Sequence, residues 1–246
     1  MANVGFKTDR GRLRGNNEDA LLVLPRMKIY AVADGVGGHN SGEVASRKAV
    51  TGLEKYIEEH SMEACYESED IKSGLISYFL DFLVKANKEI IEYSARKPEN
   101  SGMATTFVAA HIHLEKLYVV NIGDSRAYIV RDGKISQVTV DHTVVNQMIA
   151  DGDLSVEEAR VHPRKNEITR ALGAEENVVP DFFISEIMPG DRVLLCTDGL
   201  YGELSDSDIC DTVSLGDDLN DICRSLVAKA NARGGRDNVT VICVEI

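Results

Sequence analysis

The chain of 246 residues carries 40 acidic and 27 basic side chains, which gives a formal net charge of −13 at pH 7. Phosphate backbones and anionic lipids repel such an acidic protein, so the charge argues against general nucleic-acid or membrane-surface binding. Hydrophobic residues make up 43% of the chain, enough for a substantial core and too many for a disordered protein. No apolar run approaches the roughly 20 residues that span a bilayer, and the N-terminus lacks the apolar core of a signal peptide.

The cysteines are five in number, widely spaced and mostly set among apolar neighbours. None of them forms a CxxC pair, so the sequence does not predict a zinc site or a redox motif. Cysteines of this kind are typical of core positions in a reducing compartment. We therefore expect a cytoplasmic protein. From its charge we expect it to bind neither nucleic acid nor membranes, and we further expect a monomer.

The first predicted elements are a strand pair and two long helices. Short apolar runs at Leu21–Leu24 and Ile29–Ala33 flank Pro25-Arg26, a pattern typical of a β-hairpin. Apolar residues at helical spacing predict one helix from Glu43 to His60 and another from Ile71 to Arg96. The chain thus begins with β-structure and continues with helices.

Strands return in the second half of the chain, on both sides of a polar segment. Apolar runs predict strands at residues 105–114, 117–122, 127–130, 181–187, 192–196 and 239–245. Asp132-Gly133 is a typical hairpin turn, and a further helix is expected at 219–232. The polar segment 141–173 predicts short helices, broken at Gly152 and Pro163. Since no Pro/Gly/Ser-rich linker divides the chain, we expect one domain in which helices cover mostly antiparallel sheets.

Four aspartates lie at the ends of predicted strands. Apolar runs end just before Asp34, Asp124 and Asp198, and another begins just after Asp237. If these strand ends converge, the carboxylates meet at the rim of a core, where bound cations are the usual remedy for their repulsion. Oxygen ligands without a nearby His or Cys cluster favour Mg²⁺ or Mn²⁺ over zinc or copper.

Each of these features also has a plainer interpretation. Asp-Gly is mainly a turn signature, and only its repetition at strand ends favours a site over independent turns. The glycine-rich run 34–39 lets the main chain approach a ligand closely, but it matches no complete phosphate-loop pattern. His39 is equally consistent with a loop histidine, and Arg14 with an ordinary surface arginine rather than a phosphate ligand. Glu18 and Asp19 are equally consistent with solvated acids.

Eight short motifs follow one another along the chain: RxxNED at 14–19, DGVGGH at 34–39, TT at 105–106, GDSRAY at 123–128, DHT at 141–143, RALG at 170–173, TDGL at 197–200 and RDNVT at 236–240. In this order they resemble bacterial members of the PPM family, the metal-dependent (PP2C-type) protein serine/threonine phosphatases. The sequence departs from the family pattern at Ala104, where members usually have glycine. Alanine is a tolerated small residue on a buried strand, so this departure does not affect the expected chemistry.

The resemblance implies an α+β fold, a four-layer α-β-β-α sandwich in which helical pairs flank two mostly antiparallel sheets. It implies one phosphatase domain over residues 1–246, with a variable flap segment at about 141–173 beside the active site. It also implies two Mn²⁺ or Mg²⁺ ions per active site and, in bacterial members, a third and weaker one.

The resemblance also assigns metal ligands, motif by motif. Asp34 would bridge two metals, and the carbonyl of Gly35 would complete the second site. Asp198 and Asp237 would hold the first metal. Asp124, together with Asp198, would hold the third.

Four further residues receive roles in the same way. Glu18 and Asp19 would orient metal-bound waters. Arg14 would bind the substrate phosphate, and His39 would fit the proposed general acid.

The function that the resemblance implies is hydrolysis of phosphoserine and phosphothreonine in proteins by a metal-activated water, in line and without a phosphoenzyme. Such an enzyme would reverse bacterial Ser/Thr kinase signalling, with phosphorylated proteins, including a cognate kinase, as partners. Two other hypotheses are an inactive member that binds phosphoproteins and an enzyme dedicated to one sporulation- or stress-type switch. The intact metal aspartates and the intact Arg14 and His39 motifs favour the general phosphatase.

Overall fold

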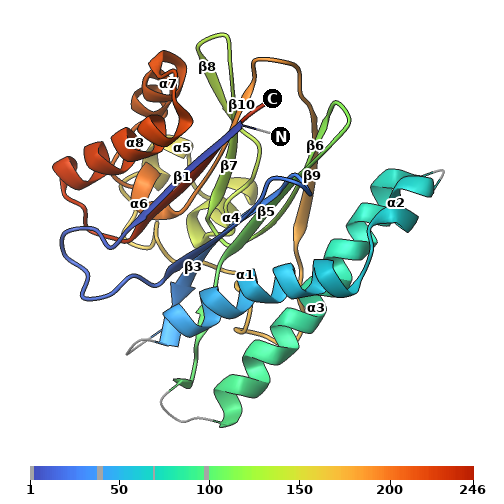
Figure 1. Cartoon of the computed structure of the whole chain (residues 1–246). Helices are drawn as coiled ribbons and strands as arrows, with labels where there is room; N and C mark the ends of the chain where they lie inside the picture. Colours follow the sequence, from blue (N-terminus) through green and yellow to red (C-terminus); the bar gives the residue numbers. More distant parts are fainter. Residues whose placement is uncertain (1–2, 38–40, 69, 97–99) are drawn as a thin grey trace.

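Two β-sheets lie face to face in the computed structural model, which describes residues 3–37, 41–68, 70–96 and 100–246 (Figure 1). The first sheet has the strand order β1 (Asn3–Asp9), β11 (Val239–Glu245), β10 (Arg192–Cys196), β7 (Arg126–Arg131) and β8 (Lys134–Gln137). The second has the order β2 (Asp19–Leu24), β3 (Ile29–Val36), β5 (Phe107–His113), β6 (Lys116–Ile122) and β9 (Asp181–Glu186), and β4 (Ala104–Thr105) pairs with β3. Every pairing between these strands is antiparallel.

Helices cover the outer face of each sheet (Figure 1). On one side α1 (Ser41–Glu59) packs on β2 and β3, and α3 (Ile71–Arg96) packs on α1, with the short α2 (Glu63–Glu67) between them in the chain. On the other side α8 (Leu219–Arg233) packs on β1 and β11, and α7 (Asp206–Leu215) packs on α8. The expected four-layer α-β-β-α sandwich is therefore confirmed.

Three apolar clusters fill the spaces between the four layers. One lies between the sheets, and the other two lie between each sheet and its helices. In β11 the side chains of Val241 and Cys243 pack in the cluster under the helices, whereas Ile242 and Val244 pack between the sheets. Because β11 is buried on both faces, its sequence is a nearly continuous apolar run.

Most predicted elements occur where they were expected. The helix predicted at 71–96 is α3, and the polar segment contains the two short helices α4 (Val144–Ala150) and α5 (Val156–Ala159). Asp132 and Gly133 have φ values of 49° and 69°, as the predicted hairpin turn requires. All five cysteines are free and buried, as expected of core residues. The sequence prediction did not include β1, α7 or the single-turn helix α6 (Asp198–Tyr201).

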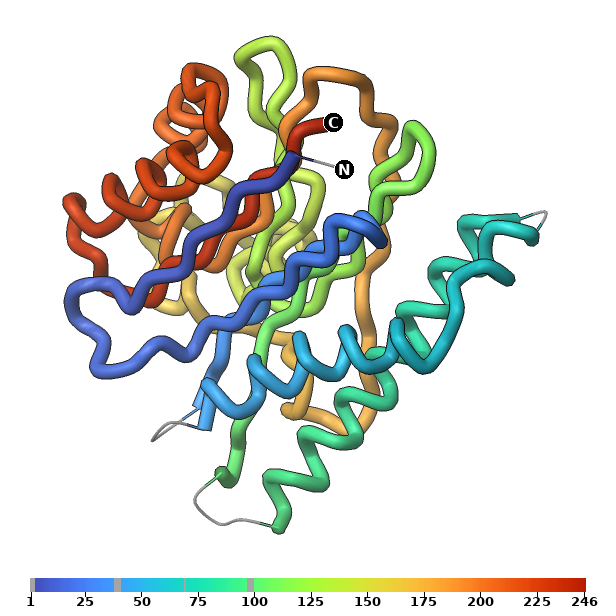
Figure 2. The backbone as a smooth tube through the Cα atoms, in the orientation of Figure 1, coloured from blue at the N-terminus to red at the C-terminus, as the bar shows by residue number. Residues whose placement is uncertain are grey.

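The register of β1 and β11 distinguishes the two ends of the sandwich. Figure 2 shows the chain termini close together, and Asn3 pairs with Glu245 at that end. At the other end of the same strands Asp9 pairs with Val239. The segment before β11, which contains Asp237, therefore lies at the end of the sandwich away from the termini.

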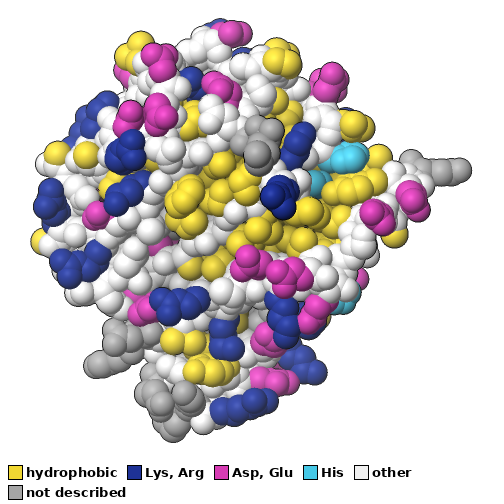
Figure 3. Space-filling model, viewed as in Figure 1, with side chains coloured by type: hydrophobic (Ala, Val, Ile, Leu, Met, Phe, Trp, Pro, Cys, Tyr) yellow, Lys and Arg dark blue, Asp and Glu magenta, His cyan; other side chains and the backbone are white. Residues whose placement is uncertain are grey.

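The surface is apolar along one open edge of the sandwich. Figure 3 shows a hydrophobic band across the face where the edge strands β1 and β2 lie. Val4, Leu21 and Val23 are half-buried and pack against the core between the sheets, so they form its margin. Of the helices that the structure describes, none is long and apolar enough to cross a membrane.

Candidate metal centre

The antiparallel register brings the predicted aspartates to the end of the sandwich away from the termini. Asp19 at the start of β2 pairs with Asp34 near the end of β3. β6 ends at this end of the second sheet, two residues before Asp124. In the first sheet β10 ends and β11 begins at the same end, beside Asp198 and Asp237. The convergence that the sequence analysis assumed therefore occurs.

Asp34 differs from the prediction in one respect, because it lies within β3 rather than after its end. The strand continues because Gly35 pairs with Thr105 of β4 and donates its N–H to the carbonyl of Glu18 at 3.1 Å. The amide of Asp34 itself donates to the hydroxyl of Thr106 at 3.0 Å. Hydrogen bonds on both sides, to Glu18 just before β2 and to Thr106 between β4 and β5, thus fix the backbone that carries this carboxylate, although the apolar sequence pattern ends one residue earlier.

Burial and mutual repulsion raise the pKa values of Asp19, Asp34, Asp124 and Asp198. Burial is the largest cause in each case, and neighbouring aspartates add to it. The pKa of Asp34 lies well above its usual range, that of Asp19 and that of Asp124 are raised to about 7, and that of Asp198 is raised to about 6. At neutral pH the chain alone offers this cluster too little positive charge.

Two oxygen atoms in the cluster also lack a hydrogen-bond partner. Oδ1 of Asp19 and Oδ1 of Asp198 are buried and accept no hydrogen bond from any residue that the structure describes. Buried polar atoms nearly always have a partner, so these two require one that the chain does not supply. A divalent cation together with the waters it binds would supply partners for both oxygens and offset the excess of negative charge.

The donor set favours a hard cation that keeps much of its water. Within the described part of the chain, no three His, Cys, Asp or Glu side chains form a complete metal site by themselves. Mg²⁺ does not require such a site, because it is usually held by one or two carboxylates together with several waters and substrate phosphate oxygens. Shared oxygen ligands of this kind also suit Mn²⁺.

Two hydroxyl groups hold Asp19 in position. Thr240 and Thr197 donate hydrogen bonds to its Oδ2 at 2.6 and 2.9 Å, which leaves Oδ1 without a donor. These threonines were not identified as site residues from the sequence. The signal that was available is their place in the motifs TDGL and RDNVT, next to Asp198 and Asp237.

Arg14 lies at the exposed rim of the cluster. Its Nη2 donates to Oδ2 of Asp237 at 2.7 Å, and about half of its side chain is exposed, with a relative accessibility of 53%. Asn238, another residue that the sequence analysis missed, holds the loop that carries Arg14. Its side chain accepts from the amide of Glu18 at 2.7 Å and donates to the carbonyl of Asn16 at 2.9 Å. The guanidinium can therefore reach a ligand above the carboxylates.

The structure does not place every predicted residue among the aspartates. The Glu18 side chain lies beside Gly42 at the start of α1, where a Cβ on Gly42 would stand 2.3 Å from Oε2 of Glu18. It also accepts a hydrogen bond from the side chain of Asn16 at 3.2 Å. His39 lies outside the described residues.

A polar network connects Asp124 to the predicted flap. Tyr201 of α6 donates its hydroxyl to the carbonyl of Asp124 at 2.8 Å, and the Arg126 guanidinium stacks on the Tyr201 ring with its Cζ 3.5 Å from the ring centroid. Arg126 in turn forms an ion pair with Asp141 at 2.6 Å. His142 accepts a hydrogen bond from the amide before Asp124 at 3.1 Å. These contacts, which the sequence did not predict, join the first residues of the flap to the segment that carries Asp124 and to α6, which begins at Asp198.

Close backbone packing at Gly35 leads to the first prediction. A Cβ at this position would lie 2.2 Å from the carbonyl atoms of Gly42 and 2.7 Å from the carbonyl oxygen of Glu18. We expect Gly35→Ala to lower the free energy of unfolding by about 1–3 kcal/mol, because backbone must move to admit the methyl group. Chemical denaturation measures this, with Gly15→Ala as the control, since Gly15 has no atom within 4 Å of its added Cβ. Equal stability of the two variants would contradict the packing described here.

Comparison with known proteins agrees with this geometry. The family model for protein phosphatase 2C matches residues 7–239. A serine/threonine phosphatase, stp, from Listeria welshimeri is 37% identical over 243 residues, covering 98% of this chain and 94% of the relative. The serine/threonine protein phosphatase PstP of Mycobacterium tuberculosis is 36% identical over 241 residues, covering 98% of this chain and 44% of that longer relative.

Solved structures of relatives have the same fold. The crystal structure of Mycobacterium tuberculosis PstP superposes with a TM-score of 0.88 at 32% identity, covering 100% of this chain and 99% of that one. The catalytic domain of PstP in complex with two manganese ions gives a TM-score of 0.84 at 32% identity, covering 99% and 97% of the two chains. From the match over nearly its whole length, the chain belongs to the protein phosphatase 2C family.

Proposed function

We propose that this protein is a metal-dependent protein serine/threonine phosphatase whose metal ions are held at the carboxylate end of the sandwich. The observation that carries the proposal is the convergence of buried aspartates with unpartnered oxygens, in a chain of the protein phosphatase 2C family. A relative, PstP, has been solved in complex with two manganese ions, which supports two cations here.

Each candidate ligand has a proposed part in holding the cations. Asp34 and the carbonyl of Gly35 would hold the two cations together with Asp198 and Asp237. Asp124 with Asp198 would hold a third and weaker one. When bound, Mn²⁺ or Mg²⁺ lowers the pKa of a bound water and neutralises charge on the phosphoryl oxygens. Without cations, burial and repulsion from neighbouring carboxylates disfavour the charged forms of Asp34 and Asp198.

The chain's other residues position the reactants. Asp19, fixed by its two threonine hydrogen bonds, accepts a hydrogen bond through its free Oδ1 and so orients the attacking water, and Glu18 is proposed to assist it. His39 is proposed to give a proton to the departing serine or threonine oxygen, which is otherwise a poor leaving group. The proposal for His39 rests on its place in the DGVGGH motif.

Arg14 binds the substrate phosphate, exchanging its contact with Asp237 for the phosphoryl oxygens. Removing one charge-assisted pair costs about 1.5–3 kcal/mol, so we expect Arg14→Ala to raise KM for a phosphothreonine peptide roughly 10- to 100-fold. We expect kcat to fall less than KM rises, and steady-state kinetics separate the two. Arg12→Ala is the matched control, since exposed Arg12 lies in the same loop and makes no side-chain hydrogen bond with a described residue. An unchanged KM in Arg14→Ala would refute this role.

The wider setting is part of the same proposal. We assign one phosphatase domain to residues 1–246 with a flap at about 141–173, and the family match over 7–239 supports this. Five free, buried cysteines support a reducing compartment such as the cytoplasm. The proposed partners are Ser/Thr-phosphorylated proteins, a cognate kinase among them, and the proposed active form is a monomer.

The experiment that tests the substrate class compares three peptides that differ only in the phosphorylated residue. In Mn²⁺ we expect phosphate release from the phosphothreonine and phosphoserine peptides and much slower release from the phosphotyrosine peptide. Absence of release from all three, together with tight binding of the phosphopeptides, would favour the alternative of an inactive binding module. The complete set of aspartates argues against that alternative.

A further inference from the structure

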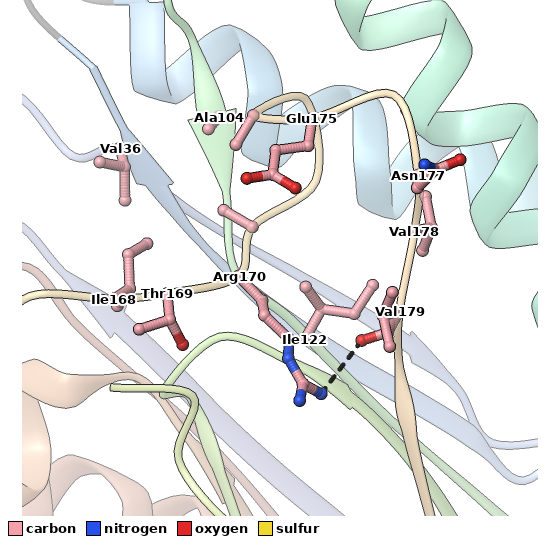
Figure 4. A pocket seen from close by; sticks show the side chains of 12 residues that line it. Val36, Ala104, Ile122, Ile168, Thr169, Arg170, Glu175, Asn177, Val178 and Val179 are labelled. Atoms are coloured by element: carbon pink, nitrogen blue, oxygen red, sulfur yellow. Dashed lines mark hydrogen bonds between the residues drawn. The ribbon is translucent and has the colours of Figure 1, made fainter. Parts of the chain in front are cut away.

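A cavity of about 600 Å³ lies next to the candidate metal centre. Figure 4 looks into it and shows residues from four parts of the chain around it: the end of β3, the start of β4, the end of β6, and the segment that follows the flap helices up to β9. Val36 and Ala104 line the side toward the metal centre, and Ile168, Val178 and Val179 line much of the rest. The cavity belongs to none of the sites described above.

The cavity is continuous with the strand that carries the bridging aspartate. Val36 follows Asp34 by two residues in β3, which corresponds to about 7 Å along a strand. The segment after the flap helices, which forms the opposite wall, is held to β4, because Thr105 and Leu172 exchange two backbone hydrogen bonds of 2.9 Å each. A substrate segment whose phosphate lies at the carboxylates and whose chain runs toward Val36 would reach this cavity within two to three residues, since extended chain spans about 3.3 Å per residue.

Within the described part of the chain, two ionisable residues line the cavity, and only one of them has a charged partner. The Arg170 guanidinium forms an ion pair with Asp181 at 3.0 Å and donates to the carbonyl of Val179 at 3.3 Å, the bond drawn in Figure 4. The Glu175 carboxylate forms no hydrogen bond or ion pair with a residue that the structure describes, and Figure 4 shows it among the lining side chains. The uncompensated charge of the cavity is therefore negative.

The remaining lining suits the stem of a long side chain. Val36 and Val179 are 42% and 58% exposed, so apolar surface is open to solvent there. Lysine and arginine bury aliphatic stems on apolar surface while their charged ends reach a polar partner. The apolar lining of the cavity complements an aliphatic stem, and the unpaired Glu175 carboxylate complements a positively charged end.

We propose that this cavity binds the side chain of a lysine or arginine that lies about two to three residues from the phosphorylated residue of the protein substrate. The inference rests on the proposed phosphatase function and adds a substrate preference to it. Glu175 pairs with the basic group, and the valine and isoleucine side chains contact its stem.

The test measures kcat/KM for phosphothreonine peptides in which one position at a time, up to about four residues on either side, is arginine, alanine or glutamate. For the wild-type protein we expect kcat/KM to be about fivefold higher for the arginine peptide than for the glutamate peptide at one position close to the phosphothreonine. This ratio corresponds to the free energy of a half-exposed ion pair. Glu175→Lys is expected to reverse that preference, and Glu175→Gln to remove it. Hydrolysis of p-nitrophenyl phosphate, which has no peptide, is expected to stay unchanged in both variants.

Glu176→Lys is the matched control, because Glu176 is exposed and adjacent but does not line the cavity. We expect it to keep the wild-type preference for arginine. A wild-type protein without a basic preference at any position, or a Glu175→Lys variant with an unaltered preference, would overturn the inference while leaving the phosphatase function in place. A wild-type protein inactive on all peptides and on p-nitrophenyl phosphate would overturn the proposed function itself, and this inference with it.

Discussion

The Asp198→Asn variant is expected to lose at least about 100-fold in kcat/KM toward a phosphothreonine peptide. Asparagine keeps the shape of the side chain but removes the charge that is proposed to hold two of the cations, and metal-ion catalysis contributes several kcal/mol to such reactions. Phosphate release at increasing Mn²⁺ concentrations measures the loss and shows how much of it excess metal restores.

The matched control for this experiment is Asp211→Asn, the same chemical change at an exposed position of α7 away from the carboxylate cluster. We expect it to retain wild-type activity. Circular dichroism of both variants establishes that they are folded. Activity of Asp198→Asn within a few-fold of wild type would contradict the assignment of Asp198 as a metal ligand.

The same substitution is expected to make the cation-free protein more stable at neutral pH. Burial, followed by repulsion from Asp237, raises the pKa of Asp198 from 3.8 to about 6 in the folded protein. Below pH 3.8 this carboxyl group is protonated in both the folded and the unfolded protein, and its burial costs no stability. As the pH rises from 3.8 to about 6, the unfolded protein loses the proton before the folded protein does, so the folded protein loses stability. The Asp198→Asn variant has no proton to lose and so escapes this penalty.

Thermal unfolding in EDTA between about pH 4 and pH 7.5 measures the difference between the two proteins. A pKa raised from 3.8 to about 6 corresponds to roughly 3 kcal/mol, and hence to a Tm about 5–10 °C higher for the variant at the upper end of that pH range. The advantage is expected to vanish near pH 4. Excess Mn²⁺ is expected to reverse the order, because it stabilises the protein that binds it more tightly. A wild-type protein that is the more stable of the two in EDTA at neutral pH would contradict the electrostatic description of the cluster.

The elements that could be predicted from the sequence are those with strong periodicity or two buried faces. α3 has an apolar face sustained over 26 residues, and β11 is apolar on both sides. β1 was missed because it is an edge strand in which Val4 and Phe6 alternate with Gly5 and Lys7, a short pattern that pairing with β11 and packing against α8 stabilise. α7 was missed although a signal existed, since Ser205 and Asp208 form a capping box at its start.

The candidate site could be predicted in its chemistry but not in its contacts. Aspartates placed where apolar strands end indicate converging carboxylates, because antiparallel strands bring alternate ends together. The hydrogen bonds from Thr197 and Thr240 to Asp19 join residues 178 and 221 positions apart, so they depend on the register of two different sheets. The stack of Arg126 on Tyr201 depends in the same way on where α6 begins. Sequence patterns report local structure, and such contacts are set by tertiary packing.

The most direct test of the proposed function is phosphate release from a phosphothreonine peptide by protein freed of metal with EDTA, before and after Mn²⁺ is added back. We predict no release above background before the addition and full recovery afterwards, because the buried carboxylates cannot bring water and phosphate together without the cations. Release at the same rate in both conditions would contradict metal-dependent hydrolysis at this site.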